Sequence, residues 1–143
     1  MRADFTLYTP EYISGVMSLR KPQKKSLEIL DIIVNSVNLK KGMNLQAALG
    51  AVKALYPTCT DFERDFMSLT FALATGVGKT RLMGAFIAYL YTQHNIKNFF
   101  VVAPNTTIYN KLCRDLNDNN SPKYVFRGLS CFCLLYTSPS PRD

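Results

Sequence analysis

The sequence predicts an α/β fold in which helices cover both faces of a parallel sheet. Two stretches carry this prediction. The apolar run from Phe66 to Ala74 ends in a Gly-rich turn, and a helical pattern follows from Arg81 to Gln93. The stretch from Phe99 to Val102 is unbroken and apolar, as expected for a strand buried between two layers of helices. Residues 66–132 would hold this sheet, and residues 1–65 would form a helical N-terminal segment.

Composition is typical of a globular protein, and its excess of positive charge is diffuse. The chain has 143 residues, enough for one domain or part of one, with 48% hydrophobic and 19% charged residues. Its net charge of +7 fits a partner rich in phosphate. No apolar run is long enough for a bilayer, and residues 1–19 lack the apolar centre of a signal peptide. We therefore predict a cytoplasmic protein with no membrane partner.

The four cysteines and the single histidine do not form a metal-binding pattern. Cys59, Cys113, Cys131 and Cys133 include no C-x-x-C pair, and His94 stands at an expected helix end. A zinc site needs more sulfur and nitrogen ligands at close spacing. The sequence therefore predicts reduced thiols and a structural histidine.

Two helices are expected in the N-terminal segment. Pro22 suits the first turn of one helix. Proline has no backbone N–H, and an N–H at that position would have no partner within the helix in any case. Asn44 can cap a second helix that runs to Leu55 or Tyr56 and is stopped by Pro57.

The turn from Thr75 to Thr80 has the pattern of a phosphate-binding loop. Gly76 and Gly78 allow backbone dihedrals that a Cβ would forbid, so successive N–H groups can point inward together. The helix that follows adds free N–H groups and the positive end of its dipole. Lys79 can reach the β- and γ-phosphates of a nucleotide, and Thr80 can offer its hydroxyl to Mg²⁺. We therefore predict catalytic roles for both side chains and a Mg²⁺ ligand at Thr80.

One position departs from the general loop pattern G-x-x-x-x-G-K-[ST], because Leu73 stands where the first glycine belongs. The match is instead to Ala-Thr-Gly-x-Gly-Lys-Thr, in which Thr75 and Gly76 make the turn. That variant resembles motif I of the superfamily 2 helicases and translocases. The alternative is a chance Gly-Lys-Thr in a surface turn, but an apolar run before it and an amphipathic helix after it favour the loop.

A second motif follows the stretch that ends at Val102. Pro104 ends the expected strand, and Asn105 or Thr106 can cap a helix through Leu116. Strand, Ala-Pro-x-Thr and helix resemble motif Ia of the same superfamily, and exposed N–H groups at a helix start suit a DNA phosphate. The alternative is an ordinary capped helix. The expected nucleic-acid contacts are Pro104, Asn105, Thr106, Thr107, Lys111 and Arg114. A third strand is expected from Tyr124 to Phe126.

Leu-Arg-x-Pro-Gln at residues 19–23 is the third resemblance. Many superfamily 2 proteins have a glutamine here whose amide pairs with the adenine edge, since an amide can donate and accept at once. The resemblance places Gln23 at the base and Arg20 beside the nucleotide. An equal alternative is that Gln23 is a first-turn helix residue within a solvated basic cluster. Together with the loop, the expected cofactor-binding residues are Arg20, Gln23, Thr75, Gly76, Val77, Gly78, Lys79, Thr80 and Arg81.

The three motifs, in this order over Leu19 to Tyr109, resemble the start of a DEAD/DEAH-type superfamily 2 ATPase, closest to the restriction (Res) subunit of type III restriction enzymes. The resemblance implies the first part of a RecA-like P-loop domain, with ATP and Mg²⁺ as cofactors. It also implies duplex DNA as a partner, a modification (methyltransferase) subunit, and a nuclease domain further along. The Asp-Glu-x-His box and the second domain with its arginine fingers are missing from this sequence. The fragment alone is therefore expected to be neither a stable monomer nor an ATPase.

Two other classes remain open at this point: a regulatory nucleotide switch that does not touch DNA, and a P-loop kinase. A kinase would more often have glycine at position 73. A switch protein would lack the motifs that surround Gln23 and Thr106.

The last eleven residues, Cys133 to Asp143, continue no periodic pattern. They are identical to a translation of the transposase-end adapter used in DNA library preparation, which predicts a disordered tail read from an adapter. The alternative is a genuine Pro/Ser-rich tail. Encoding nucleotides that differ from the adapter at synonymous positions would reject the adapter interpretation.

Overall fold

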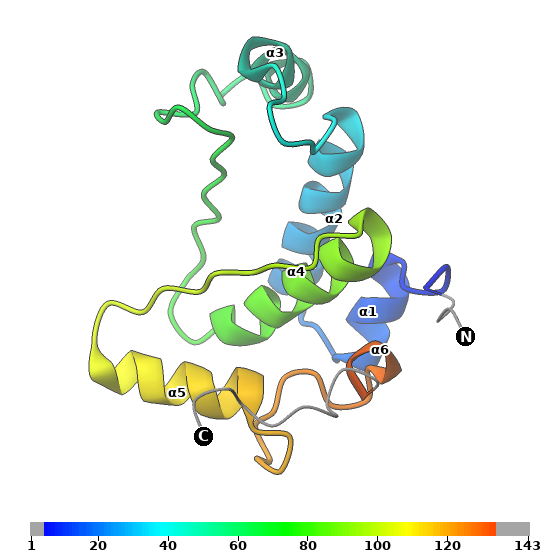
Figure 1. Ribbon diagram of the computed structural model, residues 1–143, viewed down its shortest axis with the longest axis vertical. Helices are drawn as coiled ribbons and strands as arrows, with labels where there is room; N and C mark the ends of the chain where they lie inside the picture. Colours follow the sequence, from blue (N-terminus) through cyan, green and yellow to red (C-terminus); the bar gives the residue numbers. More distant parts are fainter. Residues whose placement is uncertain (1–4, 134–143) are drawn as a thin grey trace.

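The computed structural model describes residues 5–133, and this part of the chain is built from helices joined by irregular connections. Figure 1 shows long irregular stretches between α3 and α4, between α4 and α5, and between α5 and α6. Helix α4 packs against α1, α2 and α5, while α3 packs on α2. The helices in order are α1 (Pro10–Val16), α2 (Lys21–Ser36), α3 (Leu45–Leu55), α4 (Lys79–His94), α5 (Thr106–Asn117) and α6 (Ser130–Cys133).

The predicted parallel sheet is wrong, because no residue between 5 and 133 forms a strand. Residues 66–74 and 99–102, the two expected strands, are irregular connections before and after α4. A strand exists only when its N–H and C=O groups pair with a neighbour across a ladder. No backbone hydrogen bond joins these two stretches within the described residues. The part of the chain that the structure describes therefore lacks the sheet of a RecA-like core.

Helices, rather than neighbouring strands, cover part of the apolar side chains in these stretches. Phe71 meets Phe86 of α4 edge-on, with ring centroids 4.9 Å apart. Residues 99–102 run along α4 and line a shallow groove with its apolar side chains. The cover is incomplete, because Phe100 is 94% exposed and Val102 is 72% exposed.

The third expected strand is also absent. The stretch from Tyr124 to Phe126 lies in a turn region, where the Val125 N–H donates to the Asp115 carbonyl at 2.9 Å. Val125 and Phe126 are nevertheless buried in the main core, and Tyr124 is partly buried against it. In this third stretch the apolar residues belong to the core, but their backbone forms a turn rather than a strand.

The helix predictions are confirmed for α2, α3, α4 and α5. Asn44 caps α3 by accepting from the Ala47 N–H at 3.1 Å, and Asn105 caps α5 by accepting from the Ile108 N–H at 2.9 Å. Helix α4 begins at Lys79, two residues before the predicted start at Arg81. The short helix α1, capped by the Thr9 hydroxyl, was not predicted because its sequence has only a weak apolar pattern.

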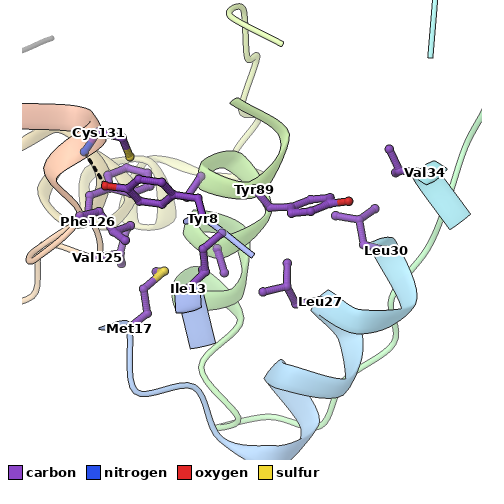
Figure 2. Packing of buried hydrophobic residues seen from close by; sticks show 13 residues of the cluster. Tyr8, Ile13, Met17, Leu27, Leu30, Val34, Tyr89, Val125, Phe126 and Cys131 are labelled. Carbon is purple, nitrogen blue, oxygen red and sulfur yellow. Dashed lines mark hydrogen bonds between the residues drawn. The ribbon is translucent and has the colours of Figure 1, made fainter. Parts of the chain in front are cut away.

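The main core forms where α4 meets α1 and α2 (Figure 2). On α4, Gly84 faces the turn before α6. A Cβ added to Gly84 would lie 2.7 Å from Val125 Cγ2, so glycine permits this close approach. The buried members of this core are Tyr8, Ile13, Met17, Leu27, Leu30, Val34, Ala85, Ala88, Tyr89, Val125, Phe126, Leu129 and Cys131.

A polar cluster joins α4 to α2 at one edge of this core. Tyr89, which is 1% exposed, donates its hydroxyl hydrogen to Asp31, and the Asn35 amide donates to the same carboxylate oxygen at 2.9 Å. The only proton of the phenol is thus used, so its oxygen accepts from His94 Nε2 at 2.9 Å. Burial, together with Asp31, raises the pKa of Tyr89, and burial lowers the pKa of His94 although Asp31 opposes that shift.

The lowered pKa of His94 predicts that the fold weakens in mild acid. A histidine whose folded pKa lies below its unfolded value contributes stability above the unfolded pKa of about 6.5, and this stability is lost as pH falls through the folded pKa. We expect the free energy of unfolding, measured by urea titration, to decrease as the pH falls below about 6.5. His94→Gln retains an N–H donor for Tyr89 and should remove this pH-dependent decrease in the free energy of unfolding. An equal decrease in the variant would contradict the assignment of this effect to His94, since the chain has no other histidine.

Candidate functional site

The Gly-rich loop before α4 is a left-handed turn that leads directly into the helix. Gly76 has a φ of 82° and Gly78 a φ of 93°, which are conformations that L side chains rarely adopt. Gly78 is also the N-cap of α4, and it has no side chain to accept from the first N–H groups of the helix. Helices α1, α3 and α5 differ in this respect, because the side chains of their N-cap residues accept such a bond. The start of α4 therefore has N–H groups without a capping side chain.

The loop is held in place by residues from the start of α2. Arg20 Nη1 donates to the Gly76 carbonyl at 3.3 Å, and Gln23 Nε2 donates to the Gly78 carbonyl at 2.8 Å. These bonds use the carbonyl side of the loop and leave its N–H groups available. The loop and α2 border a pocket of 280 Å³ lined by Ser18, Arg20, Gln23, Gly76, Val77, Gly78 and Arg81.

The Gln23 amide is engaged at both ends. Besides its bond to Gly78, its Oε1 accepts from the Arg20 N–H at 2.7 Å, and the residue is only 2% exposed. An amide in this arrangement supports the loop, a role that neither interpretation of Gln23 predicted. Pairing with an adenine edge would require these internal bonds to open, so adenine recognition by Gln23 stays a prediction.

The other predicted cofactor-binding residues lie around the same turn. Lys79 and Thr75 are exposed, and the Thr80 and Val77 side chains are partly exposed. Arg81 Nη1 donates to the Met17 carbonyl at 2.7 Å and so ties the first turn of α4 to the end of α1. The first turn of α4 contains no acidic residue.

The predicted nucleic-acid residues lie on α5 and just before it. Pro104, Thr106 and Thr107 are exposed, whereas Asn105 uses its side chain to cap its own helix. Lys111 and Arg114 each have a side chain that is 47% exposed, and both approach Asp115, whose side chain is 6% exposed. Arg114 Nε donates to Asp115 Oδ1 at 3.1 Å, and Lys111 Nζ lies 4.0 Å from Asp115 Oδ2.

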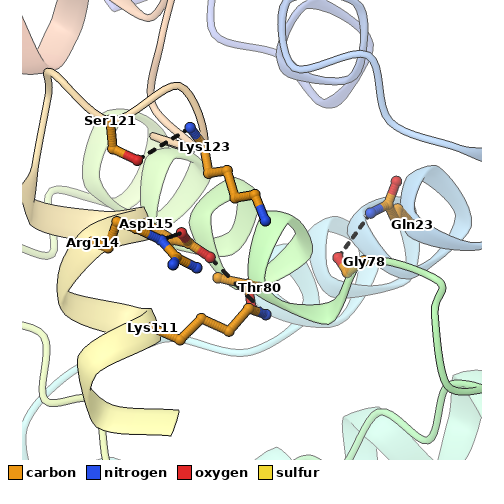
Figure 3. Close-up of polar contacts among 8 residues, drawn as sticks. All are labelled: Gln23, Gly78, Thr80, Lys111, Arg114, Asp115, Ser121 and Lys123. Carbon is orange, nitrogen blue, oxygen red and sulfur yellow. Dashed lines mark hydrogen bonds and ion pairs between the residues drawn. The ribbon is translucent and has the colours of Figure 1, made fainter. Parts of the chain in front are cut away.

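One contact joins the two predicted sites. Lys111 Nζ donates to Thr80 Oγ1 at 3.3 Å, so the basic face of α5 touches the first turn of α4 (Figure 3). The sequence analysis predicted a role for each residue separately but not their contact, because they are 31 positions apart. It also missed Asp115, which the four-residue spacing from Lys111 on a helix could have indicated.

The family model for the type III restriction enzyme res subunit matches residues 16–132, a range that includes the loop and all of α5. The chain belongs to this family. Its members are helicase-like ATPases of restriction systems, which in general use ATP and Mg²⁺, interact with DNA and work with a modification subunit. No curated protein and no solved structure matches the chain. Within residues 5–133, no helix of this Res-family chain has the length and apolar character that a membrane span requires.

The loop of this Res-family chain fits the phosphate groups of a nucleotide. Its N–H groups at the start of α4 lack a capping side chain, and the adjoining charge comes from the exposed Lys79 without an acidic neighbour in that turn. Thr80 offers a hydroxyl oxygen, the ligand type that Mg²⁺ prefers. Within the described residues, no cluster of three or more His, Cys, Asp or Glu side chains could hold a metal ion. A magnesium ion here would therefore be held mainly through the nucleotide itself.

Proposed function

We propose that this chain binds Mg²⁺·ATP at residues 75–81 and contributes to ATP hydrolysis that is coupled to action on duplex DNA. The observation that carries the proposal is the start of α4. There, a left-handed glycine turn leads into a helix whose first N–H groups have no side-chain cap. This arrangement is suited to a bound anion, because the helix dipole and the N–H groups act at the same place.

Each residue of the loop has a distinct part in this proposal. The N–H groups after Gly78 bind phosphate oxygens, and the exposed Lys79 neutralises charge on the β- and γ-phosphates. Thr80 offers its hydroxyl to Mg²⁺, which when bound offsets the negative charge of the phosphates. Arg20 and Gln23 act through the loop by holding the carbonyls of Gly76 and Gly78. The loop thereby keeps one orientation of its N–H groups.

The DNA part of the proposal rests on α5. Thr106 and Thr107 are exposed at its N-terminus, and Lys111 and Arg114 continue a positive surface along the helix. Such contacts to phosphate give affinity without reading base sequence. The family match adds support, since family members interact with DNA, and for the same reason we propose a modification subunit as a partner.

Competition binding tests the nucleotide part in the full-length protein. We expect ATP and ADP to displace a fluorescent ATP analogue in the presence of Mg²⁺, and adenosine to compete at least about tenfold less well, because it offers nothing to the charge-assisted bonds of the loop. Adenosine that competes as well as ATP would contradict a phosphate site. Equal competition by GTP would mean that Gln23 does not read the adenine edge.

The DNA part is tested by measuring hydrolysis with and without duplex DNA. Stimulation by DNA is the expected result. Hydrolysis that DNA does not change would favour a nucleotide switch, and phosphate transfer to a small acceptor would favour a kinase.

A further inference from the structure

Lys111 occupies a position that serves two proposed sites. Its ammonium group donates to the Thr80 hydroxyl at 3.3 Å, although its side chain is 47% exposed on the face of α5 that we propose for DNA (Figure 3). The lysine can therefore reach either the first turn of α4 or a polyanion in solvent. Its four-carbon stem is flexible enough to move its charge between two such partners.

The contacts of Asp115 make it easy for Lys111 to leave this position. Asp115 is a buried carboxylate and would be destabilising without a partner. Arg114 Nε donates to it at 3.1 Å, closer than Lys111 Nζ at 4.0 Å. Because Arg114 remains as the partner of the carboxylate, departure of Lys111 leaves no buried charge unpaired.

The Thr80 hydroxyl oxygen is the atom for which Lys111 and Mg²⁺ would compete. A divalent cation at this oxygen repels an ammonium group that donates to the same atom, since like charges at contact disfavour each other strongly. In this structure, Lys111 places its ammonium group 3.3 Å from that oxygen.

We infer that Lys111 couples the two sites by exchange: Mg²⁺·nucleotide displaces its ammonium group from Thr80, and the released side chain then binds the DNA backbone. This inference rests on the proposed function. By reciprocity, nucleotide with Mg²⁺ tightens DNA binding, and DNA tightens nucleotide binding by the same factor.

The test is an equilibrium binding cycle on the full-length protein that does not involve turnover. The affinity for a labelled duplex is measured by fluorescence anisotropy, with and without Mg²⁺ and a non-hydrolysable ATP analogue. We expect the unmodified protein to bind DNA about fivefold or more tightly when the analogue is present. In Lys111→Gln the ratio of the DNA affinities with and without the analogue should fall to near one. In the absence of DNA, the same variant should bind Mg²⁺·analogue more tightly, because the competing cation is gone.

Lys97→Gln is the matched control, since it also removes one positive charge but has an exposed position after the end of α4. It should retain the full ratio. Lys111→Met repeats the test with an apolar side chain of similar length, and thermal unfolding checks that each variant is folded. An unchanged ratio in both Lys111 variants, or weaker binding of Mg²⁺·analogue without DNA, would overturn the inference. Failure of the unmodified protein to bind the analogue would instead show that the proposed function itself is wrong.

Discussion

Lys79→Ala is expected to abolish ATP hydrolysis by the full-length protein while leaving its fold intact. The side chain is exposed at the first position of α4, so its removal opens no cavity, and alanine favours a helix at least as well as lysine. What the variant loses is the positive charge that we propose to lie next to the phosphate groups of the nucleotide. Removal of one preorganised charge-stabilising group typically lowers kcat by about 10²–10³-fold. We therefore expect a steady-state ATPase rate near background, with an unchanged urea unfolding curve.

Lys97→Ala is the control for this variant because it removes a lysine that is also exposed but lies beyond the other end of α4. Its ATPase rate should equal that of the unmodified protein. A normal rate in Lys79→Ala would remove the basis of the proposed nucleotide site.

Gly78→Ala should be the most damaging small substitution in the loop. A residue at φ 93° is strained whenever it carries a Cβ, at about 1–2 kcal/mol. The added Cβ would also lie 2.5 Å from Gln23 Nε2, and Gln23 cannot yield without breaking its bond to the Gly78 carbonyl. The lost bond adds about 1 kcal/mol, so we expect the free energy of unfolding to drop by about 2–3 kcal/mol. Urea titration measures this directly.

Substitutions at two other glycines separate the effect of backbone strain from the effect of the contact with Gln23. Gly76→Ala meets the same backbone strain at φ 82°, but nothing lies within 4 Å of the added Cβ. The free energy of unfolding should therefore fall by only about 1–2 kcal/mol. Gly50→Ala lies inside α3 with open space around it and should stabilise the protein by about 0.5–1 kcal/mol. Equal effects at Gly78 and Gly76 would show that contact with Gln23 is unimportant.

Local signals in the sequence predicted the helices well. Asn44 and Asn105 cap their helices as expected, because a capping bond involves residues only three positions apart. The Gly-Val-Gly-Lys-Thr turn likewise leads into α4, as its glycines and the following pattern indicated. The sheet could not be predicted in this way. An apolar run such as Phe99 to Val102 has the same pattern whether or not it forms a strand, and here it lies irregular beside α4 and stays largely exposed.

The candidate site shows the same division between local and distant contacts. The loop was found from a short motif, but the bonds that hold it come from Arg20 and Gln23, more than fifty positions earlier in the chain. The contact between Lys111 and Thr80 is also set by the packing of α5 on α4. Residues 134–143 lie outside the described part, so the adapter interpretation stays a prediction.

If the proposed function holds, the missing side-chain cap of α4 makes the stability of this protein depend on the concentration of its nucleotide. A nucleotide bound at the start of α4 would complete the helix, much as Asn44 completes α3. Such a ligand binds the folded chain but not the unfolded one, so at about one hundred times its Kd it adds about 2.7 kcal/mol to stability. That increment is large beside the 5–15 kcal/mol that typically holds a domain together. In a cell depleted of nucleotide, more copies would unfold and become open to proteolysis, and the abundance of the protein would follow the energy state of the cell.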